Sequence, residues 1–197
     1  EMGATTKFTA TQSAEAFNYM AMAGWDSQQM LDGIEGILNL AAASGEDLGT
    51  TSDIVTDALT AFGLKASDAA HFSDVLAQSA ASANTNVSMM GESFKYVAPI
   101  AGAMKYSVED TSLALGLMAN ASVKGSMAGT SLKTALANMA APTDKMATAM
   151  KKYGISLTDS NGNMKTLKGV LDNLRSSLGG LSETEKTAAA STIFGKE

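Results

Sequence analysis

The chain has 197 residues, of which 45% are hydrophobic and 17% are charged, with a net charge of -6 and no cysteine. Its aliphatic content predicts a packed core rather than a disordered tail. The lack of cysteine excludes disulfides and thiolate metal sites, and an acidic chain without a run of basic residues is not expected to bind nucleic acid. The most apolar stretch, residues 97–104, is far shorter than a membrane span, so membrane contact is not expected either.

Helix start signals recur along the first three quarters of the chain. Ser, Thr and Asp side chains can satisfy the free N–H groups of a first helical turn, and proline, which would interrupt helices, occurs only twice. Pro99 is expected to kink or end the fifth helix, and Pro142 to block continuation of the seventh. The predicted helices cover residues 11–23, 26–43, 50–62, 67–80, 88–98, 107–118, 126–139 and 143–153.

The pattern changes after Tyr153. Asn161-Gly162 tolerates the positive φ angles of a type I′ turn, which predicts a small β-hairpin within residues 154–166. A helix over residues 167–178 and a capping box at residues 182–185 follow. The predicted fold is therefore mainly all-α: a compact multi-helix domain over residues 1–197, ending in a hairpin and helices at 154–197. Neither end carries a natural end signal, so we interpret the chain as a fragment of a longer protein.

Two segments resemble each other at an offset of 80 residues. Gly45 aligns with Gly125 and Gly49 with Gly129, which gives a Gly-x-x-x-Gly-Thr connector in both places. Residues 11–62 and 88–139 are thus predicted to be two copies of one helical unit, the alternative being chance similarity in an Ala/Ser/Gly-rich chain. Glycine at such a connector can end a helix in the left-handed conformation.

Gly36 lies inside a predicted helix rather than at a connector. Alanine at this position is therefore expected to be neutral or stabilising, unless a neighbouring helix needs the space.

A search for catalytic and ligand-binding patterns gives no site. His71 is the only histidine and has no ligand or thiol near it in sequence, so a structural role is expected. The glycine-rich residues 125–131 lack the lysine of a phosphate loop. Asp159 begins a sequence like a calcium loop, but position 12 is Val170 rather than glutamate. Glu92 stands without a second polar cluster. We therefore expect no enzyme activity, no cofactor and no metal.

Four segments carry a resemblance to a known family. They are residues 94–99 (Phe-Lys-Tyr-Val-Ala-Pro), 115–121, 124–132 (Lys-Gly-Ser-Met-Ala-Gly-Thr-Ser-Leu) and the Pro-Thr pair at 142–143. Together they resemble the core region of the phage tail tape measure family, and the remaining elements follow in that family's order. Residues 121–123 (Ala-Ser-Val) depart from the family's frequent Ala-Gly-Ile.

The resemblance implies a non-enzymatic structural module. Family members lie in the tail tube, set tail length and leave through the tail on infection. The implied partners are tail tube proteins, tail assembly chaperones, baseplate or tail-tip proteins and further copies of the chain itself. The implied location is the virion tail of a phage or prophage, assembled in the host cytoplasm. Two alternatives are a cell-wall hydrolase and a membrane-active or cell-wall-penetrating helical module that aids genome delivery.

Overall fold

The computed structural model describes residues 8–195, and within them the chain forms ten α-helices and one 3-10 turn but no strand. The prediction of a mainly all-α fold is confirmed. The elements are α2 (Ala10–Met22), α3 (Ser27–Ser44), α4 (Leu48–Phe62), η1 (Ala66–Asp68), α5 (Ala69–Ser82), α6 (Val87–Ala103), α7 (Val108–Asn120), α8 (Gly125–Ala140), α9 (Asp144–Tyr153), α10 (Leu167–Gly179) and α11 (Glu183–Ile193).

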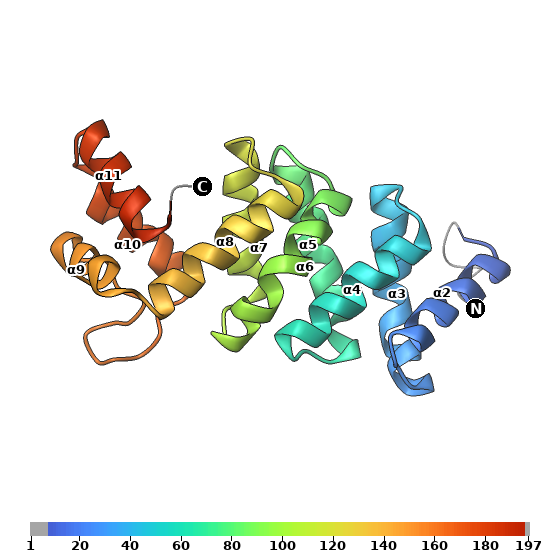
Figure 1. Ribbon diagram of the computed structural model, residues 1–197. Helices are drawn as coiled ribbons and strands as arrows, with labels where there is room; N and C mark the ends of the chain where they lie inside the picture. Colours follow the sequence, from blue (N-terminus) through green and yellow to red (C-terminus); the bar gives the residue numbers. More distant parts are fainter. Residues whose placement is uncertain (1–7, 196–197) are drawn as a thin grey trace.

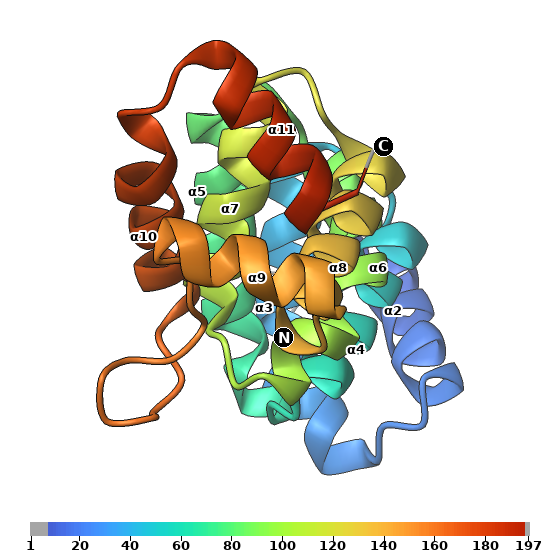
Figure 2. The same cartoon turned by 60° about the vertical axis from the view of Figure 1, so that its left-hand side comes forward.

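Helices α2 to α8 form a two-layered row, which we call the helix array (Figure 1). In one layer α2 packs on α4, α4 on α6 and α6 on α8; in the other α3 packs on α5 and α5 on α7. Helices α9 to α11, the C-terminal module, close the far end of the row, where α10 contacts α7 and α11 contacts α8 and α9 (Figure 2). Because each helix of the array contacts mainly its neighbours, the molecule is elongated.

The start points of the first layer are regularly spaced. The N-caps of α2, α4, α6 and α8 are Thr9, Asp47, Asn86 and Lys124, at intervals of 38 or 39 residues. The first three side chains accept a hydrogen bond from a backbone N–H in the first turn, which satisfies part of the helix's free donors. Each interval contains two helices, one for each layer, so the successive helices of the first layer lie side by side.

The core of the array lies between its two layers. Phe94 of α6 meets Phe72 of α5 edge to face, with ring centroids 5.4 Å apart, and Phe62 of α4 at 5.9 Å. Phe72 and Phe94 are fully buried. These rings therefore join three successive helices across both layers.

Pro99 lies inside α6, and the helix continues past it to Ala103. Of the two predicted outcomes at Pro99, a kink or an end near residue 98, the end is therefore wrong. The residues that follow, Ala101 and Gly102, are buried, and a Cβ on Gly102 would overlap Ala61 O of α4. This close packing on α4 stabilises the last turn although proline removes one backbone hydrogen bond.

The predicted β-hairpin is wrong: residues 154–166 form a loop with one isolated bridge, between Thr158 and Met164. Gly162 has φ +83°, but Asn161 is not among the described residues with positive φ, so the type I′ turn does not form. Instead Gly162 N–H donates to Asp159 O at 3.2 Å, and the Asp159 carboxylate accepts from the N–H groups of Asn161 and Asn163. A carboxylate, rather than a strand ladder, shapes this turn, and the loop stands away from the helices in Figure 2.

Candidate functional site

Titratable side chains in the described part of the chain do not gather into a catalytic or metal-binding group. No set of three His, Cys, Asp or Glu residues there could hold a metal ion. His71 of α5 instead meets Glu109 of α7, with Nε2 2.6 Å from Oε1, and both side chains are at least half exposed. Burial acts to raise the pKa of Glu109, but hydrogen bonds from its own backbone N–H, from His71 and from Ser107 outweigh it and lower that pKa. This pair links two helices of the array.

Gly45 and Gly125 both have positive φ, +76° and +58°, but they occupy different positions. Gly45 is the left-handed C-cap that ends α3, whereas Gly125 is the first residue of α8. The left-handed residue after α7 is Ser122, at φ +68°. By position in the connector, Gly45 therefore corresponds to Ser122, at an offset of 77 rather than 80, and the two-copy repeat stays a prediction.

Three other glycines lie where helices approach closely. A Cβ on Gly129 of α8 would overlap Ser93 O of α6, and one on Gly49 would lie 2.9 Å from the Tyr19 ring of α2. A Cβ on Gly36 of α3 would lie 2.6 Å from Ala70 N of α5. The neighbouring helix needs the space at Gly36, so alanine there is expected to destabilise the fold.

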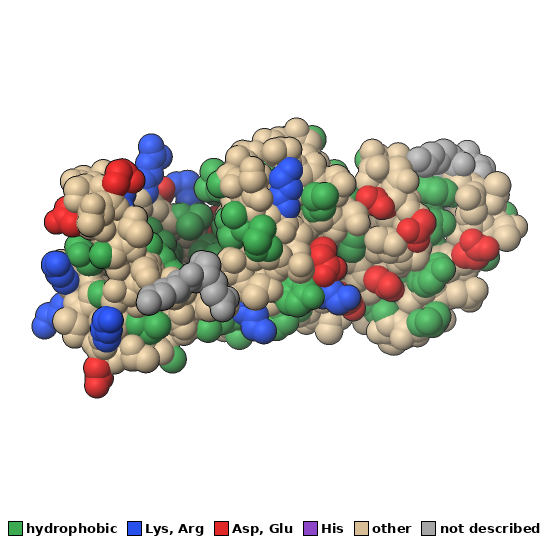
Figure 3. Space-filling view, turned by 45° about the horizontal axis from the view of Figure 1, so that its top comes forward, with side chains coloured by type: hydrophobic (Ala, Val, Ile, Leu, Met, Phe, Trp, Pro, Cys, Tyr) green, Lys and Arg blue, Asp and Glu red, His purple; other side chains and the backbone are tan. Residues whose placement is uncertain are grey.

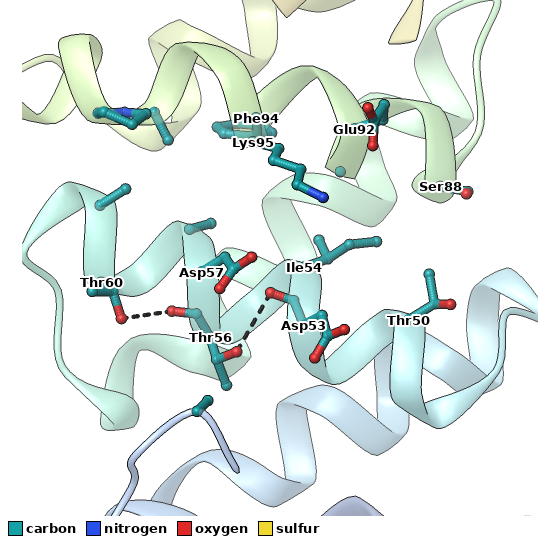
Figure 4. Close-up of a pocket in the computed structure, with 16 residues that line it drawn as sticks. Thr50, Asp53, Ile54, Thr56, Asp57, Thr60, Ser88, Glu92, Phe94 and Lys95 are labelled. Carbon is teal, nitrogen blue, oxygen red and sulfur yellow. Dashed lines mark hydrogen bonds between the residues drawn. The ribbon is translucent and has the colours of Figure 1, made fainter. Parts of the chain in front are cut away.

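A polar groove of about 520 Å³ lies between α4 and α6 (Figure 4). Asp53 and Asp57 of α4 and Glu92 and Lys95 of α6 line it, and Lys95 extends toward α4. Burial, and then the charge of Asp57, raises the pKa of Asp53, while Lys95 opposes the rise.

Two hydroxyls in this groove, those of Thr56 and Thr60, bond to the backbone of α4. Thr56 donates to Asp53 O and Thr60 to Thr56 O, as Figure 4 shows. No nucleophile paired with a base lines the groove. The groove thus presents carboxylates from both helices and one amine, from Lys95.

A second groove, of about 680 Å³, lies between α5 and α7; we call it the α5–α7 groove. The His71–Glu109 pair spans one end, and at the other Asn84 N–H donates to Asn120 Oδ1 at 2.8 Å. The sequence does not reveal this groove, because Leu113 and Leu117 are apolar residues of the predicted helix at 107–118 and such residues are usually buried. The structure leaves the two leucines 43% and 54% exposed.

No helix in the described part of the chain is long and apolar enough to cross a membrane. The array of helical pairs defines the class of the chain as an elongated all-α domain. Residues 1–195 match the family model of the phage-related minor tail protein, and the chain belongs to that family.

Two curated relatives match along the whole chain. The chain is 40% identical to the tape measure protein of Pneumococcus phage Dp-1 and 29% identical to the probable tape measure protein of Escherichia phage P2. It spans 17% and 24% of the length of these two relatives. No solved structure matches the chain.

Proposed function

We propose that this chain is a structural and assembly module of a phage or prophage tail tape measure protein. Its contribution to tail assembly and tail length determination is made through protein–protein packing. The match to the minor tail protein family from residue 1 to residue 195 is the observation that carries the proposal. The elongated helix array supports it, because quasi-linear helical arrays present long surfaces to partners.

The proposed partners are tail tube, tail assembly chaperone and baseplate or tail-tip proteins. The module would then reside in the virion tail after assembly in the host cytoplasm. Among the described residues, the grooves between α4 and α6 and between α5 and α7 are the surfaces on which such partners would pack.

The test is an in-frame deletion of residues 8–195 from the parent gene in the phage, followed by electron microscopy of the particles. We expect tails to be absent or shortened. If the segment lies in the tail as one extended helix, the loss of length is roughly 280 Å at ~1.5 Å per residue. Tails of normal number and length from the deletion phage would refute the proposal.

Two point variants test whether tail assembly requires the folded helix array or only the presence of the segment. Gly129→Val places side-chain atoms against Ser93 O and should reproduce the assembly defect if the folded array is what acts. Gly179→Ala is the matched control, since a Cβ there meets no atom within 4 Å and assembly should be normal.

A further inference from the structure

We propose that the outer face of α2 and α3 is the interface for a further helical pair, formed by the segment of the parent chain that immediately precedes residue 1. Helices α2 and α3 form one end of the helix array (Figure 1). At the other end the C-terminal module covers α7 and α8 (Figure 2). The terminal pairs of a helical array need such a cover or a polar outer face. This packing goes beyond the proposed function, because it joins two parts of one parent chain.

The other helices of the first layer show which position of α2 should face a preceding helix. The fifth residue after the N-cap is buried in α4, α6 and α8, where it is Ser52, Gly91 and Gly129. A Cβ on Gly91 would meet Ile54 of α4, and one on Gly129 would meet Ser93 O of α6. This position is therefore turned toward the preceding helix of the layer. In α2 it is Ala14, which is exposed.

The twelfth residue after the N-cap repeats this contrast. It is buried in α4, α6 and α8, where it is Leu59, Ala98 and Leu136. In α2 it is Ala21, which is exposed. Ala14 and Ala21 are seven residues apart, close to two helical turns, so they share one face of α2. Tyr19, which lies against Gly49 of α4, points to the opposite side of the helix. The exposed face of α2 is thus turned away from α4.

The second layer shows the same difference. Its fifth residue after the N-cap is Ser73 in α5 and Ser112 in α7, which are 3% and 1% exposed. Ser112 lines the α5–α7 groove, so this position is also turned toward the preceding helix. In α3 it is Leu31, which is 59% exposed. A leucine in water forgoes the stabilisation that burial would give. One further pair, with a helix in each layer, would cover the exposed positions of both α2 and α3.

The segment before residue 1 is the occupant that continues the array. Each pair of helices with its connectors takes 38 or 39 residues. The chain spans only 17% and 24% of its two curated relatives, so the parent protein has ample length outside it. About 40 residues directly before the chain would form one pair and reach α2 without a long loop. The small side chains of Ala14 and Ala21 suit close contact with a helix, as Gly91 and Gly129 do within the array.

Hydrogen exchange tests the proposal on the purified 197-residue chain and on the same chain extended upstream by about 40 residues of the parent sequence. We expect the extension to slow amide exchange in α2 and α3 at least about tenfold, and to leave exchange in α10 unchanged. The slowing should be independent of protein concentration, because the covering segment belongs to the same chain. Slowing that appears only at high concentration would show that a second copy covers the face, and would overturn the proposal.

Two substitutions at adjacent positions of α2 provide the matched comparison. Ala21→Asp places a charge in the proposed interface, so it should remove most of the protection that the extension adds, and Leu31→Asp should do the same. Both residues are exposed in the 197-residue chain, which should stay folded. Met22→Asp is the control and should keep the protection. Met22 is 82% exposed, and the corresponding residues of the layer are exposed as well: Thr60, Pro99 and Ala137.

Two results would contradict this interface. One is an extended chain in which α2 exchanges as fast as it does in the 197-residue chain. The other is an extended chain in which Ala21→Asp and Met22→Asp reduce the protection equally.

Discussion

In the helix array, Gly36, Gly102 and Gly129 face the backbone of a neighbouring helix, whereas the two glycines at the end of α10 face open space. A Cβ on Gly102 or Gly129 would overlap a carbonyl oxygen of the adjacent helix, but none placed on Gly179 or Gly180 would meet an atom within 4 Å. Backbone contact thus fixes the helix spacing in the array. The C-terminal module is held by side chains instead, such as Leu167, Val170 and Ile193, which are buried.

The two regions also differ in charge. Residues 8–141 carry 13 acidic and 5 basic side chains, and residues 142–195 carry 5 acidic and 7 basic ones. In Figure 3 acidic side chains dominate the part of the surface that belongs to the first helices, and most basic ones lie toward the other end. Charge is therefore distributed unequally along the long axis, and salt would screen the field that it produces.

The largest expected effect comes from the aromatic centre of the array. Phe94→Ala should lower the free energy of unfolding by about 3–5 kcal/mol, because it leaves a cavity between Phe62 and Phe72. Leu174→Ala, at a partly buried position of the C-terminal module, should cost clearly less. Urea unfolding of both variants measures the difference. Equal losses of unfolding free energy in the two variants would show that the aromatic centre of the array contributes no more to stability than the C-terminal module.

Glycine substitutions sharpen the comparison of backbone contact. Gly129→Ala should cost about 1–3 kcal/mol, since either α6 or α8 must shift to admit the Cβ. Gly179→Ala should be neutral or stabilising by up to about 1 kcal/mol, because alanine favours a helix and the position is open. Thermal melts compare the two, and a stable Gly129→Ala variant would contradict the proposed role of close packing.

Alanine at the two connector glycines, Gly45 and Gly125, should destabilise the fold for a different reason. Gly45 and Gly125 have positive φ and open surroundings, so Gly45→Ala and Gly125→Ala should each cost roughly 1–2 kcal/mol from backbone strain alone. Gly180, with φ -87°, is the control in the C-terminal module and should tolerate alanine. If both connector variants melt like Gly180→Ala, backbone strain does not limit stability at these sites.

The sequence was informative wherever local chemistry decides the structure. The capping box at residues 182–185 and the capping serine at 107 begin helices as predicted, because those contacts span only three residues. Two predictions were wrong: the helix end near Pro99 and the β-hairpin at Asn161-Gly162. Packing on α4 carried α6 past the proline, and the Asp159 carboxylate shaped the turn in place of a strand ladder.

The two grooves could not be predicted from the sequence, because they depend on how helices that are distant along the chain are spaced. Whether Leu117 is buried depends on how far α5 and α7 stand apart, which no local pattern encodes. Gly36 shows the same limit: its surroundings are set by Ala69 and Ala70, more than thirty residues away in sequence. Helix positions could be predicted from sequence, whereas the faces left uncovered by neighbouring helices could not.

The smallest expected effect concerns Asp47, which caps α4 in the helix array with a carboxyl group that titrates. The Thr50 hydroxyl and then the Thr50 backbone N–H, at 2.6 and 2.9 Å from the Asp47 carboxylate, hold the pKa of Asp47 below its usual 3.8. Asp47→Ala should therefore cost about 1 kcal/mol at neutral pH. A lowered folded-state pKa means that the stabilisation is complete above 3.8 and disappears as the pH falls through the folded-state pKa.

The cost of Asp47→Ala should accordingly shrink below about pH 4, whereas the cost of Thr143→Ala should not. Thr143 caps α9 in the C-terminal module with a hydroxyl that does not titrate, so it is the matched control. Urea unfolding of both variants from neutral pH to the acid limit of the folded state makes the comparison. A cost at Asp47 that is constant with pH would mean that the carboxylate caps α4 equally well when protonated.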